Sequence, residues 1–471
     1  MTLFLSFILL CSTPTVDPKV ESGSISSSNA SYDGSALILK GQVQLDHGLG
    51  KMEAEEATLQ KQENTKDFPF SLIHLAKQVS LKLHHSGELK CQEADLDFAN
   101  LQGHLTSNDR VIYTDSLKRK KGKPSSVKLL SKIVDLQFIK KSENPKSTYD
   151  IQNVIARDQV ELTYAQDYTL STDAILYQKN LVDPSNHDFQ THLSSYGKER
   201  CKLIHQADTI EAEHFDLDVV NNRLVMKKPE GVVSSFSKGE VRFTSDNLLW
   251  DHEKSTLHLK GNPSLQEPNL GTMVSDQEIT LIKKEKQLVG LKSLGNTTLT
   301  YLNNHKLVSH GTLNFDRTRH NSNIESPRVK GVVPENLQLS YEEGEMKVLA
   351  DQAHVEYTEE EGAFHPVSVS LKGHIKIFSH HTEKPTRFGL ADRLTYSPTT
   401  RTFILGADPG KKVVFVNDEE NLRISAQEVH ITQDPLTKKQ TVKGLGNVQF
   451  ALSSEEETNL NKYFNKYATA P

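Results

Sequence analysis

Two short sequence words recur along this chain of 471 residues, and they restrict the possible fold more than any other feature. The first word is a small residue, an acid and then two apolar residues at alternate positions, as in Ser245-Asp246-x-Leu248-x-Trp250. Such alternation indicates a strand with one buried face. The acids of its copies are Glu55, Asp173, Asp246, Asp351 and Asp392, and a shifted form begins at Ser275 and Ser425. A word repeated over this length predicts a repeat architecture built from strands.

The second word is an alternating strand with a glycine on its apolar parity, as in the segment LILKGQVQL at residues 37–45. The pattern returns along the chain, and its repeat glycines are Gly41, Gly261, Gly295, Gly373 and Gly446. Glycine adds no side chain and weakens a strand interior, so its recurrence needs a physical reason. Either it lets the sheet turn a corner, as glycine kinks do in curved sheets, or it leaves space for a ligand.

Composition and turn spacing define the fold class. The apolar share of 36% predicts a thin core, because typical domains reach roughly 45–50% when glycine is counted. Polar turns recur about every 8–12 residues, which is typical of sandwiches, barrels and solenoids. We therefore predict an all-β fold, an elongated β-jelly-roll forming a β-solenoid-like trough of many short antiparallel strands. The spacing of Leu460, Tyr463, Phe464 and Tyr467 predicts a short C-terminal helix.

The expected organisation has four parts. Residues 1–20 form a signal-like segment, whose apolar run from Leu3 to Leu10 is too short to span a bilayer. Cleavage of this segment and lipidation at Cys11 both remain open. Residues 21–235 and 236–455 are expected to be the N-terminal and C-terminal halves of the β-jelly-roll, and residues 456–471 the short helix and tail. No other segment is long and apolar enough to cross a membrane as a helix.

The word order of residues 36–60 resembles the start of the OstA-like family of lipopolysaccharide-transport proteins, which includes LptA, LptC and the N-terminal domain of LptD. The matching elements are Gly41-Gln42-Val43 followed by the small–acidic pair Ala54-Glu55, and Gly446-Asn447-Val448 is the most literal copy of the Gly-Asn-Val element. The resemblance implies an apolar β-trough that holds the acyl chains of lipopolysaccharide or a similar lipid. It also implies sheet edges that pair with other envelope transport proteins across the periplasm.

The candidate lipid-binding residues are the apolar residues of the glycine-containing strands. A trough needs apolar side chains on one parity only, and these strands supply them. An acyl chain gains about 0.8 kcal/mol for each buried CH₂, so an apolar wall alone can hold it. The candidates are Leu37, Leu39, Val43, Leu45, Leu257, Leu259, Val369, Leu371, Ile375, Ile377, Val448 and Phe450.

Other chemistry finds little support in the sequence. The repeated acids occupy equivalent positions, whereas catalysis needs a convergent set with unequal roles, so a turn-closing hydrogen bond explains them better. Adjacent histidines on a strand point to opposite faces, and no Cys/His spacing suits zinc, so we expect no metal and no cofactor. The net charge of −6 gives no basic field for nucleic acid. Cys91 and Cys201 can form one disulfide or remain two free buried thiols.

These observations lead to a first hypothesis and an alternative. The first is a non-enzymatic, periplasmic protein of lipopolysaccharide transport or outer-membrane biogenesis, peripheral to membranes, with acyl chains in its trough. The alternative is an exported structural or adhesive β-solenoid scaffold that binds no lipid. A continuous open apolar groove favours transport, whereas a filled interior favours the scaffold.

Overall fold

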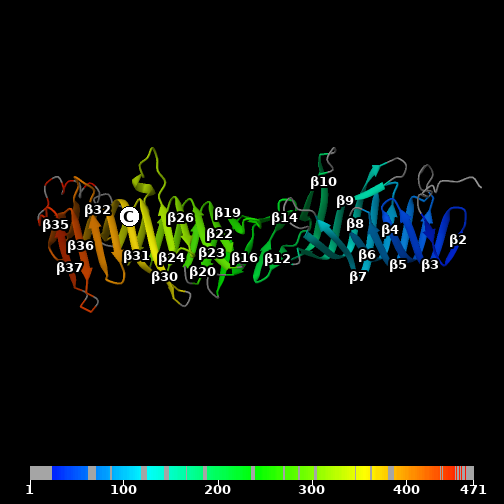
Figure 1. Ribbon diagram of the computed structural model, residues 1–471, viewed down its shortest axis with the longest axis horizontal. Helices are drawn as coiled ribbons and strands as arrows, with labels where there is room; N and C mark the ends of the chain where they lie inside the picture. The colour runs from blue at the N-terminus through cyan, green and yellow to red at the C-terminus, as the bar shows by residue number, and fades with distance from the viewer. Residues whose placement is uncertain are drawn as a thin grey trace, which may run out of the picture. The chain divides into compact units, whose positions relative to one another are not determined.

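A computed structural model (Figure 1) describes residues 24–61, 70–84, 87–117, 125–142, 148–165, 167–183, 188–234, 239–268, 271–284, 287–301, 305–344, 346–360, 363–379, 387–434, 436–437, 439–450, 452, 454, 456, 458 and 462. These residues are mostly in β-strands that pair antiparallel, together with one short 3-10 helix, η1 (Glu335–Leu337). The expected all-β fold of many short antiparallel strands is therefore confirmed.

The chain divides into two compact units, each described separately below. Unit 1 comprises Met1–Leu117, Pro124–Ala165 and Ala174–Phe189, and unit 2 comprises Lys118–Lys123, Gln166–Asp173 and Gln190–Pro471. The expected boundary at 235/236 falls inside unit 2, between two strands that pair with each other, β16 (Glu230–Ser234) and β17 (Glu240–Thr244). The division in the structure thus lies earlier in the chain than the sequence analysis placed it.

Unit 1 is an antiparallel meander of long, bent strands. Each strand from β3 to β9 pairs with the next, and β1 and β2 both pair with β3. The register shifts near the middle of every pair, so each long strand has two arms separated by a bulge. The strands are β1 (Ile25–Ser26), β2 (Asn29–Tyr32), β3 (Ala36–His47), β4 (Gly50–Gln60), β5 (Leu72–Leu83), β6 (Glu88–Asp97), β7 (Gln102–Leu117), β8 (Ser125–Ser142) and β9 (Thr148–Tyr164). Residues of β10 (Tyr168–Asp183) and β11 (Asp188–Ser195) are divided between the two units.

Unit 2 is built from shorter strands in two antiparallel ladders. Its other strands are β12 (Cys201–His205), β13 (Asp208–Ala212), β14 (His214–Asp218), β15 (Arg223–Lys227), β16, β17, β18 (Asn247–Asp251), β19 (Thr256–Lys260), β20 (Ser264–Glu267), β21 (Gly271–Ser275), β22 (Glu278–Lys284), β23 (Gln287–Leu294), β24 (Thr297–Tyr301), β25 (His305–Ser309), β26 (Thr312–Asp316), β27 (Asn321–Glu325), β28 (Leu339–Glu343), β29 (Met346–Ala350), β30 (Gln352–Glu360), β31 (Ala363–Ser379), β32 (Arg387–Ser397), β33 (Thr402–Gly406), β34 (Val413–Asn417), β35 (Leu422–Ala426), β36 (Glu428–Gln433) and β37 (Gln440–Leu445).

Successive hairpins of unit 2 join the two ladders alternately. Ladder A contains β12, β13, β16, β17, β20, β21, β24, β25, β28, β29, β34 and β35. Ladder B contains β14, β15, β18, β19, β22, β23, β26, β27, β30, β33, β36 and β37. The longer strands β31 and β32 bend and belong to both ladders. The chain therefore crosses from one ladder to the other after every hairpin.

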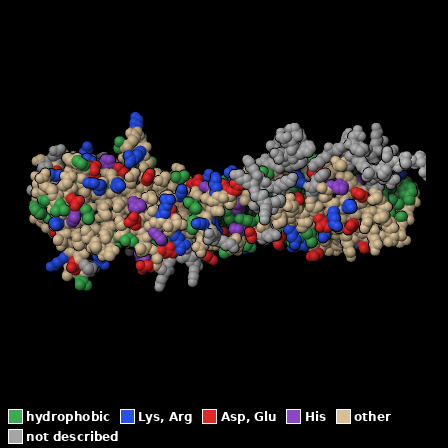
Figure 2. Space-filling model, in the orientation of Figure 1, with side chains coloured by type: hydrophobic (Ala, Val, Ile, Leu, Met, Phe, Trp, Pro, Cys, Tyr) green, Lys and Arg blue, Asp and Glu red, His purple; other side chains and the backbone are tan. Residues whose placement is uncertain are grey.

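Few residues at the two chain ends are among those that the structure describes. The signal-like segment 1–20 lies outside the described residues, as does most of 456–471. Ser454, Glu456, Thr458 and Lys462, which are described there, have helical backbone. Within the described part of the chain, no helix is long and apolar enough to cross a membrane. On the face seen in Figure 2, acidic and basic side chains are interspersed rather than separated by sign.

Candidate functional site

The inward face of ladder B carries a continuous buried row that is apolar except for Ser293, and each residue pairs in register with the next across the strands. Two lipid-binding candidates, Leu259 and Leu371, belong to it. No member of the row is more than 8% exposed. The row is Phe215, Met226, Leu248, Leu259, Ile279, Ser293, Leu313, Ile324, Ala353, Leu371, Leu394, Leu405 and Val429. The alternation in the sequence thus found the buried face correctly, and this part of the interior is filled.

The candidates of unit 1 are also in a filled interior. Leu39, Val43 and Leu45 are fully buried, with Leu39 on one arm of β3 and the other two on the second arm. Leu39 belongs to a buried row in which leucine and alanine alternate as far as Leu105, followed by Val134 and Ala156. The row is Leu39, Ala57, Leu75, Ala94, Leu105, Val134 and Ala156. Leu37 is half-buried. The remaining buried candidates, in unit 2, are Leu257 and Ile375.

Part of the inward face of unit 2 is open to solvent. On ladder A, the inward row is buried at Phe243, Leu265 and Met273, but the residues that follow in register are only half-buried. These residues are Leu299, Leu307, Tyr341, Val348 and Ile377. On ladder B, the half-buried residues that pair in register are Val355, Val369 and Tyr396. We call these eight residues the open stripe.

The open stripe contains residues of both ladders, and two of its tyrosines lie near each other. Burial raises the pKa of the Tyr341 hydroxyl, with Glu343 adding to the effect, and Tyr396 of ladder B is close enough to contribute. Tyr341 also holds its hydroxyl in place, since it lies 2.6 Å from His305 Nδ1 and donates to Glu343. Two candidates from the sequence, Val369 and Ile377, line the stripe. The other six residues were missed, although several of them alternate in the same way.

Two candidates are wrong. Val448 is 38% exposed and Phe450 is 72% exposed, so neither lines an interior. The cause is their position in the last repeat, because β37 ends at Leu445. Beyond it, the described backbone makes a single bridge, between Ser425 and Gln449, and no further strand covers the two side chains.

The repeat glycines of unit 2 mark crossings between the ladders, and Gly41 marks the bend between the two arms of β3. All five have φ between +70° and +85°, and at four of them the next residue, Gln42, Asn262, His374 or Asn447, is also left-handed. Two consecutive left-handed residues turn the chain sharply, and glycine reaches this region without steric cost. At Gly41 and Gly373 the register of the strand pair shifts across this bend. The recurring glycine therefore bends the sheet, as the first of the two interpretations proposed.

Acids fill the space beside three of these glycines, whereas Gly41 faces Ser28 and Gly446 faces Gln427. In unit 2 the glycine word lies where the chain crosses from ladder B to ladder A, and the acid word lies at the return crossing. A Cβ atom on Gly261 would lie 2.5 Å from Asp246 Oδ2, and Gly295 and Gly373 face Asp276 and Asp351 equally closely. The two words are thus complementary halves of one contact, and no void remains there for a ligand.

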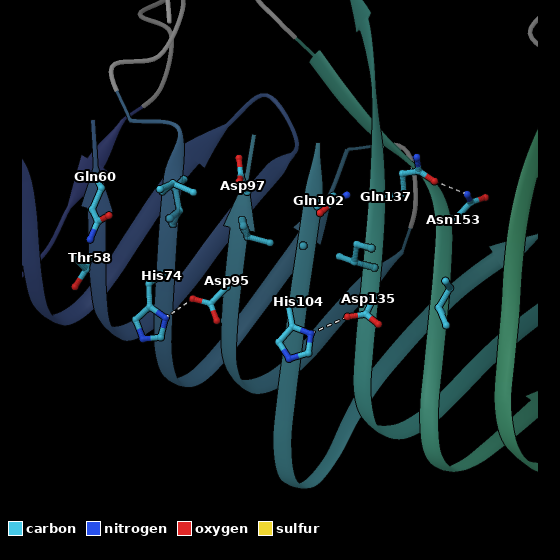
Figure 3. A pocket seen from close by; sticks show the side chains of 16 residues that line it. Thr58, Gln60, His74, Asp95, Asp97, Gln102, His104, Asp135, Gln137 and Asn153 are labelled. Carbon is cyan, nitrogen blue, oxygen red and sulfur yellow. Dashed lines mark hydrogen bonds and ion pairs between the residues drawn. The ribbon is translucent and has the colours of Figure 1, made fainter. Parts of the chain in front are cut away.

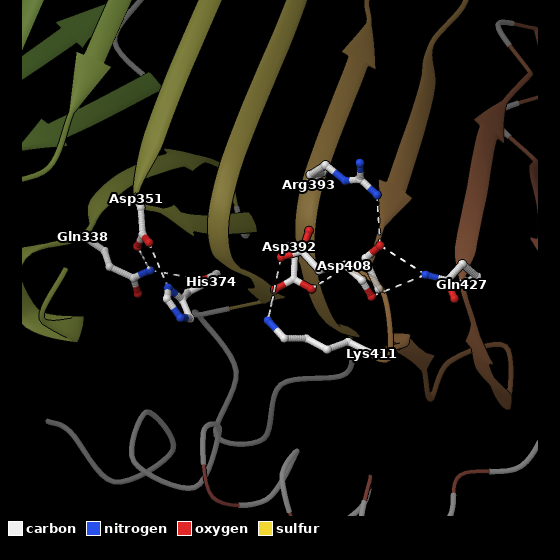
Figure 4. A network of polar contacts seen from close by, with 9 residues as sticks. Gln338, Asp351, His374, Asp392, Arg393, Asp408, Lys411 and Gln427 are labelled. Atoms are coloured by element: carbon white, nitrogen blue, oxygen red, sulfur yellow. Dashed lines mark hydrogen bonds and ion pairs between the residues drawn. The ribbon is translucent and has the colours of Figure 1, made fainter. Parts of the chain in front are cut away.

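Asp351 and Asp392 close their crossings with hydrogen bonds (Figure 4). Asp392 Oδ2 accepts from the backbone N–H of Asp408 at 2.9 Å, and Lys411 Nζ donates to Oδ1 at 2.8 Å. Burial opposes ionisation of Asp392, but these two donors hold its pKa below the usual value. Asp351 accepts from Gln338 Nε2 at 2.8 Å and lies 2.8 Å from His374 Nδ1.

Equivalent contacts occur at other copies of the word. Asp276 accepts from the Asn296 backbone N–H at 2.7 Å, and Asp173 accepts from that of Lys198 at 2.8 Å. The expectation that the repeated acids close turns is confirmed at these positions.

The two described cysteines are free thiols rather than a disulfide. Both are buried, and burial raises the pKa of Cys91 to about 12 and that of Cys201 to about 11. A thiol with so high a pKa is almost entirely protonated near neutral pH and is a poor nucleophile or metal ligand. In the described part of the chain, no group of three or more His, Cys, Asp or Glu residues is arranged to hold a metal ion.

Comparison of the chain with models of known protein families and with curated proteins found no match. The function is therefore inferred from the geometry of the inward face and from the resemblance in the sequence.

Proposed function

We propose that the protein carries an acylated lipid of the lipopolysaccharide type in a bacterial envelope compartment, without converting it chemically. The observation that supports this proposal is the open stripe, an in-register apolar surface that is left half-exposed on the inward face of unit 2. Contiguous exposed apolar surface is uncommon on a protein with no partner and often marks a binding site. The OstA-like word order at residues 36–60 supports lipid as the occupant.

Acyl chains suit this surface because the stripe crosses the strands in register. Neighbouring strands lie about 4.8 Å apart, so the ladder A part, from β24 to β31, extends over roughly 20 Å. An extended acyl chain along it would lose contact with water at about 0.8 kcal/mol for each CH₂.

The alternative is a structural scaffold without lipid, and one observation favours it. The buried rows around Leu39 and Leu259 are closed without any ligand, so most of the interior needs no occupant. In that case the open stripe would be a surface for another protein. The two functions differ in whether lipid reaches Val369 and Ile377.

Site-specific photo-crosslinking in cells distinguishes the two functions. A benzophenone amino acid is placed at Val369 or Ile377, and adducts of the full chain are examined by mass spectrometry and by an antibody to lipopolysaccharide. Because both positions are half-exposed, the bulky group fits without unpacking the core. Lys372, which is exposed on the same strand, is the matched control. Lipid adducts at Val369 and Ile377 but not at Lys372 are expected.

The opposite pattern would argue for the scaffold. If Val369 and Ile377 yield protein adducts or none, while the folded chain is purified free of lipid, the carrier proposal is wrong. A third position, the fully buried Leu259, should give no adduct in either case. Lipid that binds at the open stripe does not contact the buried row of ladder B.

A further inference from the structure

A groove of about 630 Å³ crosses the outward face of unit 1, over strands β4 to β9 (Figure 3). Two parallel rows of side chains line it, each running across the strands in register. The first row is Thr58, His74, Asp95, His104, Asp135 and Ile155. The second row is Gln60, Leu72, Asp97, Gln102, Gln137 and Asn153. We call them the His–Asp row and the amide row.

The carboxylates of the groove already have partners within the chain. Asp95 and Asp135 each lie 2.7 Å from a histidine Nδ1, that of His74 and His104 respectively, and Arg157 also pairs with Asp135. Asp97 accepts from two backbone N–H groups and from Asn100 Nδ2 in the turn that follows β6. The residues that line the groove include no lysine or arginine. A phosphate or carboxylate ligand would therefore meet the lining carboxylates, and the nearby Arg157 guanidinium is already paired with Asp135.

The groups that remain available are hydrogen-bonding side chains. Each histidine donates from Nδ1 to a carboxylate, so its Nε2 is the ring nitrogen that can meet a ligand. Gln60 and Gln102 are exposed, and a primary amide offers both donors and an acceptor. Asn153 Nδ2 donates to Gln137 at 2.7 Å, which links the last two amides of the row. This mixture complements hydroxyl groups, which donate and accept at once.

The spacing of the rows suits a chain of repeated units. Adjacent strands lie about 4.8 Å apart, so neighbouring side chains of a row are separated by a distance similar to the length of one sugar in an extended glycan. The six strands together span roughly 24 Å. Leu72 and Ile155 are half-buried in the two rows, and they offer apolar surface to the C–H faces of sugar rings.

We propose that this groove binds a neutral glycan, which lies across β4 to β9 and is hydrogen-bonded by the His–Asp row and the amide row. This site is separate from the open stripe: it lies on the outward face of unit 1 and needs no lipid. The proposal therefore stands or falls independently of lipid carriage.

The test uses the full chain on a glycan array that carries neutral, acidic and amino glycans. Binding to neutral glycans is expected, and the strongest of them is then titrated by calorimetry. Gln60→Ala and Gln102→Ala should each weaken binding about tenfold, which corresponds to one lost hydrogen bond of about 1.4 kcal/mol. Both residues are exposed, so the fold tolerates the changes. Gln44→Ala, at an exposed glutamine of β3 outside the groove, should leave the affinity unchanged.

Several results would overturn the proposal. Binding confined to acidic or amino glycans would mean that charge governs recognition, contrary to the neutral groups of the groove. Absence of binding to every neutral glycan, or neutral binding that survives Gln60→Ala and Gln102→Ala unchanged, would also refute it. Affinity for the neutral glycan should not change with salt concentration, because screening acts on charged pairs.

Discussion

Substitution Gly373→Ala tests the contact between the two sequence words. Gly373 has φ of +77°, and an added Cβ would press on the carboxylate of Asp351. A left-handed conformation costs an alanine about 1–2 kcal/mol. Displacing the carboxylate also weakens its hydrogen bonds with Gln338 and His374, each worth about 1 kcal/mol. The expected loss of local stability is therefore about 3–4 kcal/mol.

A double-mutant cycle separates the two contributions. In an Asp351→Ala background the carboxylate is gone, so Gly373→Ala should cost only about 1–2 kcal/mol, the price of the dihedral angle. Gly410→Ala is the matched control, because Gly410 has φ of +85° and open space around its Cβ position. Hydrogen exchange measured by mass spectrometry reports the free energy of local opening, over 346–379 for Gly373→Ala and over 402–417 for the control. If Gly373→Ala costs the same in both backgrounds, or no more than Gly410→Ala, then the acid does not determine the need for glycine.

Other predictions concern the core, the acids and the thiols. Leu259→Ala should lower the free energy of local opening by about 2–5 kcal/mol, whereas Phe450→Ala should change it by less than about 0.5 kcal/mol, both measured by hydrogen exchange. Since the pKa of Asp392 is lowered in the folded chain, its stabilisation is present above an unfolded pKa of about 3.9 and is lost as the pH falls through the folded value. Asp392→Asn should therefore flatten the fall in thermal midpoint between neutral and acid pH, and an unchanged pH dependence would contradict this. Cys91 and Cys201 should resist alkylation at pH 8 until the chain is unfolded, as peptide mass spectrometry would show.

The sequence predicted the buried faces because burial follows the alternation of side chains along a strand. Leu39, Leu257 and Leu259 needed only that rule. Phe450 obeys the same rule and is nevertheless exposed, because burial also needs a neighbouring strand, and alternation does not say where the ladder ends. The exposure of Ile377 likewise depends on which strands lie around it, and this is decided by strand pairing rather than by the alternation.

Bends without glycine were beyond the reach of the sequence. Lys77-Gln78 and Asp158-Gln159 are consecutive left-handed pairs like those at the repeat glycines, and they bend β5 and β9. Lys77-Gln78 contains none of the residue types that mark such turns, and Asp158-Gln159 contains one, an aspartate that occurs in many other contexts. The groove of unit 1 was also missed, because its rows join residues from six strands that come together only through the register of the sheet.

Because hairpins alternate between the two ladders, unit 2 can gain or lose length only in certain multiples of a hairpin. Removing one hairpin would leave one ladder a pair of strands short and would shift every later acid away from its glycine. Removing two consecutive hairpins, such as β18–β19 with β20–β21, takes one from each ladder and brings equivalent partners together. Gene duplication or deletion should therefore lengthen or shorten such a chain in fixed steps. Each step that preserves the fold should comprise one hairpin of each ladder, with one copy of each word.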